Sequence, residues 1–140
     1  RVWRRGNARG APAARAARVT AAPRESWIVL LHRVEERTLY EAAAMAASAT
    51  ALGIAVTLVW FDSALDALVD GALGDVEDES TSAALFASAR ATGLLRSLAC
   101  SASAVNRPGG IAAARQAVDD VVGWPTVISL IRGSNRSFVW

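Results

Sequence analysis

The chain has a single cysteine, Cys100, and its surroundings are those of a reactive thiol. Cys100 ends a short apolar run, LLRSLAC, and two small hydroxyl residues, Ser101 and Ser103, follow at once. In α/β folds, chemistry is placed at the carboxyl end of a buried strand, where the chain turns toward a helix. Backbone N–H groups, hydroxyls or a cation at such a position favour the nucleophilic thiolate. Arg107, in the following loop, is the candidate cation.

One thiol limits the chemistry that this site can perform. A single cysteine excludes an internal disulfide, a CxxC redox pair and a cysteine-based zinc site. It is sufficient for carrying sulfur as a persulfide, because the receiving thiol can lie on a partner protein. The alternative is that Cys100 only packs in the core, as free cysteines often do.

His32 is the second candidate for the same site. It ends the first apolar run of the chain, and the carboxyl ends of parallel strands lie at one edge of a sheet. We therefore expect His32 near Cys100, where it either tunes the thiolate, contacts a ligand or bonds to nearby backbone. Because His32 is the only histidine, a histidine-cluster metal site is not expected. No spacing supports a Ser-His-Asp arrangement, and we expect no metal or organic cofactor.

Two continuous apolar runs at the start of the domain predict buried strands. Ser26–His32 and Ile54–Phe61 contain β-branched residues and no polar alternation, which is typical of strands covered on both faces. Between them, an alanine-rich helix is expected to begin at a capping box formed by Thr38 and Glu41 and to end at Gly53. Strand and helix signals in this order predict a parallel α/β sheet with right-handed crossovers.

The rest of the chain continues the alternation. Ser63 and Asp66 have capping spacing at the start of a second helix, and Asp66 with Asp70 is interpreted as an exposed helix face. The remaining expectations are an acidic surface loop over 74–80, a helix over 82–92, the strand that ends at Cys100, a loop or anion site at 106–110, a helix over 111–120, an ambiguous segment 124–131 and a strand over 137–140. Trp27, Trp60 and Trp124 are interpreted as core or subunit-contact residues.

Charge separates the chain into two parts. Residues 1–24 carry seven arginines and no acid, whereas the rest carries eight arginines and all thirteen acids. We expect residues 1–24 to be a disordered Arg/Ala-rich tail or sequence upstream of the domain. The alternatives are a basic arm for nucleic acid or anionic lipid, and an organellar transit peptide. Residues 25–140 form the expected domain, whose net negative charge argues against nucleic-acid binding. No run is long enough to span a membrane.

The order of these pieces resembles the DsrE/DsrF-like family over roughly residues 26–140. The resemblance rests on the strands WIVLLH and IAVTLVWF, the helix that closes at Leu52-Gly53, the strand ending LACSAS after Gly93, the pair Val122-Gly123 before a late helix, and the terminal SFVW. It implies a three-layer, flavodoxin-like α/β domain with a mostly parallel sheet flanked by helices. It also implies that 124–131 is helical, against its β-branched composition, with Pro125 in the first turn.

The resemblance also implies a function. Several members of that family form trimers or hexamers, and some carry sulfur as a cysteine persulfide in sulfur relay. Only Cys100 carries over as a functional position, and members without the cysteine exist. We therefore expect a cytoplasmic homo-oligomer that carries sulfane sulfur on Cys100 to or from a thiol-bearing partner, with His32, Ser101, Ser103 and Arg107 as binding candidates. The alternative is a non-catalytic oligomeric domain that binds a small ligand or partner at this edge, with Cys100 structural.

Overall fold

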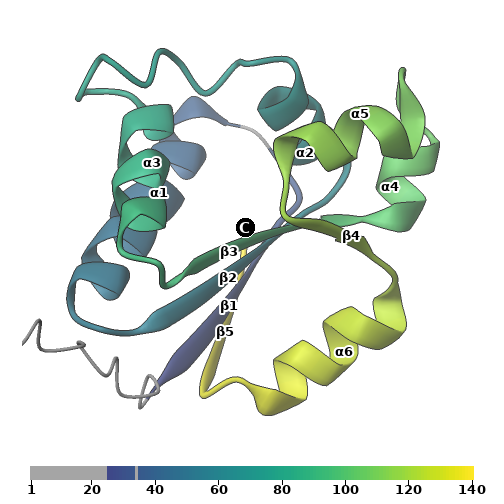
Figure 1. The fold of residues 1–140 in the computed structure, drawn as a ribbon. Coiled ribbons are helices and arrows are strands. Elements are labelled where there is room, and N and C mark those ends of the chain that lie inside the picture. The colour runs from purple at the N-terminus through teal and green to yellow at the C-terminus, as the bar shows by residue number, and fades with distance from the viewer. Residues whose placement is uncertain (1–24, 34) are drawn as a thin grey trace, which may run out of the picture.

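A computed structural model describes residues 25–33 and 35–140, and in it five parallel strands form one sheet between two layers of helices (Figure 1). The strands are β1 (Ser26–Leu31), β2 (Ala55–Trp60), β3 (Leu95–Cys100), β4 (Asp120–Val122) and β5 (Arg136–Val139). The helices are α1 (Glu36–Ala51), α2 (Asp62–Val69), α3 (Ser82–Ala91), α4 (Ser101–Val105), α5 (Gly110–Ala117) and α6 (Trp124–Gly133). The predicted three-layer α/β fold is confirmed.

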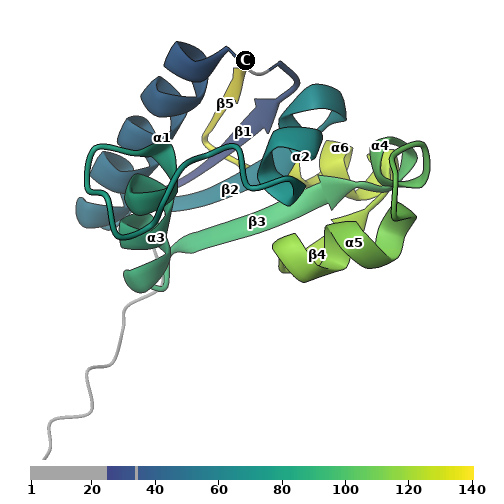
Figure 2. The same cartoon turned by 90° about the horizontal axis from the view of Figure 1, so that it is seen from above.

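The strand order β4-β3-β2-β1-β5 fixes which helices lie on which face of the sheet. The chain advances in one direction from β1 to β4, and right-handed crossovers place α1 to α5 on one face, which we call the first face. After β4 the chain returns to the opposite edge through α6, which lies alone on the second face (Figures 1 and 2).

Two hydrophobic clusters follow from this arrangement, because successive side chains of a strand point to opposite faces. The cluster on the first face contains Val29 and Trp60 from the strands together with residues of α1 to α5. The cluster on the second face contains Ile28, Val59 and Cys100 together with Val127 of α6. Burial on both faces is the physical reason that the strands have continuous apolar sequences.

The starts of α1 and α2 that the capping spacings predicted are both wrong. α1 begins at Glu36, two residues before Thr38, and α2 begins at Asp62, one residue before Ser63. The N-cap residues are Glu35 and Phe61, which make no side-chain cap bond. Serine or threonine three residues before an acid also occurs inside helices, so the spacing alone did not locate the first turn. α3 is different, since the Thr81 hydroxyl accepts a hydrogen bond from the Ala84 N–H at 3.2 Å.

Helix α6 and its neighbours test the ambiguous segments. Residues 124–131 are helical, as the resemblance implied, and Pro125 stands in the first turn of α6. Two elements that were not predicted are α4, which directly follows Cys100, and the short strand β4. Neither has enough residues to show a hydrophobic period.

The predicted tail over residues 1–24 lies outside the described residues. Every helix in the described part of the chain is too short or too polar to cross a bilayer.

Candidate functional site

The sheet reverses its winding direction between β3 and β4. The segment after β3 enters α4 on the first face, whereas the segment after β4 enters α6 on the second face. The two connections begin side by side, since a Cβ built on Gly123 would lie 3.7 Å from Ser101 Oγ. In open α/β sheets, ligands bind in the crevice outside the carboxyl ends of the strands at such a reversal. The site that the sequence predicted lies at this edge.

Cys100 lies at this edge but its side chain is enclosed. It is the last residue of β3 and only 2% exposed. It points to the second face, in the cluster that includes Phe61, Val122 and Val127. The described residues therefore place the thiol in an apolar environment beneath α6. Its reactivity stays a prediction.

His32 is brought to the same edge, directly after β1. Its ring stacks on Phe61 with centroids 4.3 Å apart and planes 9° apart, and the Phe61 ring in turn contacts Trp124 at 5.2 Å. Its backbone N–H donates to the Trp140 carbonyl at 2.6 Å, and its carbonyl accepts from the Ser63 hydroxyl at 3.2 Å. Its Nδ1 lies 3.9 Å from Asp62 Oδ2, a pair that is ionic only when the imidazole is protonated. The backbone of His32 is thus held firmly while its ring faces a carboxylate.

Asp62 is a residue of this site that the sequence analysis missed. It is separated from the end of β2 by Phe61 alone and has φ +43°, the only positive φ of a non-glycine residue among those described. Aspartate adopts a left-handed backbone more readily than most L-residues, and residues in such sparsely populated conformations are concentrated at functional sites. Its Oδ1 accepts a hydrogen bond from the Ser103 hydroxyl at 2.9 Å, and the side chain is 72% exposed. An acidic residue immediately after a buried strand was the available signal.

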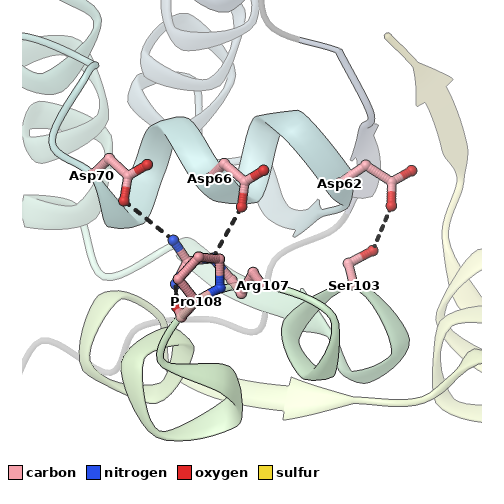
Figure 3. A network of polar contacts seen from close by, with 6 residues as sticks. All are labelled: Asp62, Asp66, Asp70, Ser103, Arg107 and Pro108. Carbon is pink, nitrogen blue, oxygen red and sulfur yellow. Dashed lines mark hydrogen bonds and ion pairs between the residues drawn. The ribbon is translucent and has the colours of Figure 1, made fainter.

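Arg107 takes part in a different interaction from the one expected. Its Nε donates to Asp66 Oδ1 at 3.0 Å, and its Nη2 donates to Asp70 Oδ1 at 3.2 Å (Figure 3). A third bond, from Nη1 to the Pro108 carbonyl at 2.9 Å, fixes the guanidinium, and the side chain is only 5% exposed. Asp66 and Asp70 are therefore not merely an exposed helix face, as the sequence suggested. They hold Arg107, so α2 is fastened to the segment between α4 and α5.

Figure 3 shows that the acids of α2 lie along one side of the helix and face the segment that follows Cys100. Asp62 meets Ser103, and Asp66 and Asp70 meet Arg107, so i, i+4 spacing on α2 matches i, i+4 spacing on the facing segment. Of the predicted residues, the structure groups His32 and Ser103 around Asp62. Ser101 lies beside Gly123, and Arg107 is engaged further along α2.

A hollow of about 550 Å³ opens beside Asp62. Its lining residues are His32, Arg33, Asp62, Ser63, Val139 and Trp140. The lining combines one carboxylate, one guanidinium, an imidazole, a hydroxyl and an apolar wall from the end of β5. This mixture suits reversible binding of a small polar molecule.

Neither a metal-binding cluster among the described residues nor a match to a known protein identifies the function of this site. Within residues 25–33 and 35–140, no three His, Cys, Asp or Glu side chains lie close enough together to hold a metal ion. No protein-family model matches the chain, and no curated protein matches it significantly.

We predict that Arg107→Ala lowers the free energy of unfolding by about 1–2 kcal/mol, since bonds to charged groups are lost while Asp66 and Asp70 can be rehydrated. The matched control is Arg37→Ala. Arg37 also forms an ion pair, with Glu41, but its side chain is 90% exposed. The control should change stability by no more than about 0.5 kcal/mol. Urea unfolding measures both values, and equal losses would contradict the fastening role of Arg107.

Proposed function

We propose that the protein is a non-catalytic α/β domain that binds a small zwitterionic molecule of the amino-acid type at the carboxyl edge of its sheet. The observation that carries this proposal is the hollow beside Asp62, which holds opposite charges against an apolar wall. Cys100 has a packing role in this proposal, because its 2% exposure keeps the thiol away from solutes. This proposal is the second of the two functions expected from the sequence, a non-catalytic binding domain, with a class of ligand added.

The charges of the hollow support a zwitterion. Ser103 donates to Asp62 Oδ1. Asp62 Oδ2 lies 3.9 Å from His32 Nδ1 and accepts no hydrogen bond from a described residue, so it can receive one from an ammonium group. Arg33 is exposed at the rim and offers a guanidinium, which binds a carboxylate through parallel hydrogen bonds. Val139 and Trp140 offer an apolar surface to the rest of the ligand.

The backbone of Asp62 supports a functional role for the same carboxylate. A strained residue persists only when its surroundings determine its conformation. Here the Ser103 hydroxyl on one side and the stacked rings of His32 and Phe61 on the other supply those surroundings. These contacts hold the carboxylate at the edge of the sheet, where a ligand can reach it.

Three related probes test the proposed ligand class: L-phenylalanine, phenethylamine, which lacks the carboxylate, and 3-phenylpropanoate, which lacks the ammonium group. We expect phenylalanine to bind at least about 10-fold more tightly than either, since each deletion removes a charge-assisted bond worth about 1.4 kcal/mol or more. Chemical-shift changes in NMR spectra measure the affinities.

The variants separate the two charges. Asp62→Asn should remove the advantage of phenylalanine over 3-phenylpropanoate, and Arg33→Gln should remove its advantage over phenethylamine. Ser88→Ala, an exposed change on α3, should alter neither. If wild-type protein shows no shifts near His32 with millimolar phenylalanine, the proposal is rejected.

A second candidate function is sulfur relay on Cys100, and the position of the thiol favours it. Cys100 ends β3 beside the reversal of the sheet, and Ser101 and Ser103 follow it there. In this proposal the thiolate attacks a terminal sulfur of a polysulfide, a Cys–S–S⁻ persulfide forms, and the polysulfide leaves one sulfur shorter. A thiol of a partner protein then accepts that sulfur. Such a carrier suits a reducing compartment such as the cytoplasm.

Thiol reactivity distinguishes the two candidates. If Cys100 packs, a disulfide reagent should modify it at least about 100-fold more slowly in native protein than in urea, because access requires local opening. Incubation with polysulfide should then add no mass to the native chain. A gain of one sulfur atom, reversed by reductant and absent in Cys100→Ser, would establish the carrier instead.

We propose that the protein is a homo-oligomer, and exposed apolar residues support this. Trp124 and Ile128 on α6 and Val139 on the edge strand β5 are all largely exposed in the single chain. Light scattering after size exclusion should give the mass of a trimer or hexamer, and Ile128→Asp should shift it toward the monomer. A monomeric wild type at micromolar concentration would contradict this prediction.

A further inference from the structure

A cavity of about 290 Å³ lies on the first face of the sheet, apart from the carboxyl edge. Its floor is the second half of β2 and the first half of β3, and its sides come from α2, α3, the segment that joins these two helices and the end of α5. Figure 2 shows that this segment spans the distance between the two helices over the sheet. Leu58, Trp60, Leu68, Phe86 and Leu95 supply most of the apolar lining.

The cavity opens to solvent on one side and its lining is largely apolar, as is typical of sites for small molecules. Apolar cavities of about 150 Å³ already bind molecules such as benzene. The cavity here is larger, and its walls are aromatic and aliphatic side chains on three separate elements. One of these contacts is fixed, since the rings of Trp60 and Phe86 meet edge-on with centroids 5.5 Å apart. The cavity is therefore a formed site for an apolar molecule.

One buried polar group lines the floor. Ser97 of β3 is 4% exposed, and its Oγ accepts a hydrogen bond from Trp60 Nε1 at 2.9 Å. No described residue accepts the hydrogen of the Ser97 hydroxyl itself. The Ser97 hydroxyl can therefore donate to a ligand that brings an acceptor to the floor of the cavity, and such a ligand gains a hydrogen bond.

The charge at the mouth excludes a strongly anionic ligand. Arg90 lines the cavity, but its Nη1 bonds Asp119 Oδ1 at 2.8 Å, so its charge is neutralised in place. Burial alone would raise the pKa of Asp119, but the hydrogen bonds from Arg90 and from the Ser97 N–H outweigh it and hold that pKa below its usual value. The pair is therefore ionic at neutral pH. The acidic residues of the 74–80 segment lie close by and repel an anion further.

We infer that this cavity binds a small neutral apolar molecule with one carbonyl-type acceptor, which receives the hydrogen bond of Ser97 Oγ. The site is separate from the proposed zwitterion site and does not depend on it. An aromatic ketone satisfies each requirement: the ring packs against Trp60 and Phe86, and the carbonyl oxygen reaches Ser97.

Two isosteric probes test this inference. Acetophenone carries the acceptor, and α-methylstyrene has the same shape with a CH₂ group in place of the oxygen. We expect both to bind. After correction for the different free energies of transferring the two probes out of water, acetophenone should bind about 10-fold more tightly, since only acetophenone can accept the hydrogen bond of Ser97. Binding is measured by NMR through the indole signal of Trp60.

Variants locate the site and the hydrogen bond. Ser97→Ala should remove the preference for acetophenone and retain α-methylstyrene. Because Ser97→Ala also leaves Trp60 Nε1 unpaired and can weaken the fold, Ala87→Phe is a second variant, which fills the cavity from α3 and should abolish binding of both probes. Ser88→Ala is the matched surface control.

Three outcomes would overturn the inference: no binding of either probe to wild type, binding that survives Ala87→Phe, or the same acetophenone preference in folded Ser97→Ala. Binding of phenylalanine at the carboxyl edge is measured separately through signals near His32. The two proposals can therefore fail independently.

Discussion

A parallel sheet must be covered on both faces, and in this chain the second face depends on a single helix. Five helices share the first face, whereas α6 alone packs on the second through Val127 and neighbouring apolar residues. This imbalance explains several features together. Cys100 is buried because α6 lies over it, and Trp124 and Ile128 are exposed because no other element among the described residues covers the outer side of α6. The lone helix also creates the reversal of the sheet beside β4.

Strand β2 connects the two proposed binding regions. Trp60 and Phe61 are consecutive, so their side chains point to opposite faces. Trp60 lines the cavity on the first face and bonds Ser97, whereas Phe61 stacks under His32 beside Asp62. Two different environments, one largely apolar and the other lined by charged and polar groups, thus rest on adjacent residues. A displacement of the end of β2 would therefore alter both sites, although they open in different directions.

The sequence predicted most of the fold because the strong signals are local. Long apolar runs located β1, β2 and β3, and Gly53, with φ +84°, ended α1 where expected. The helix starts were not predictable from capping patterns, since packing at the strand ends moved them ahead of Thr38 and Ser63. α4 and β4 are too short to show a period.

The site was predicted in outline only. Parallel topology correctly placed His32 and Cys100 at one edge. The strain of Asp62 depends on backbone geometry that no residue pattern encodes, and the partners of Arg107 lie 41 and 37 residues away in sequence. The cavity at Ser97 arises from the distance between α2 and α3, which is a property of tertiary packing. Residue types therefore located the edge, and geometry determined which groups meet there.

The bonds of Arg107 have a consequence for how the molecule can open. They join α2 to the segment between α4 and α5, so this side of the first face resists deformation as one block. The cover of Cys100, by contrast, is one helix that lies between Gly123 and Ser134 and has a single fully buried side chain, Val127. The least costly route from solvent to the thiol is thus the undocking of α6. The rate at which a reagent or partner reaches Cys100 would therefore be limited by the undocking of α6. A protein that bound the undocked α6 would expose the thiol.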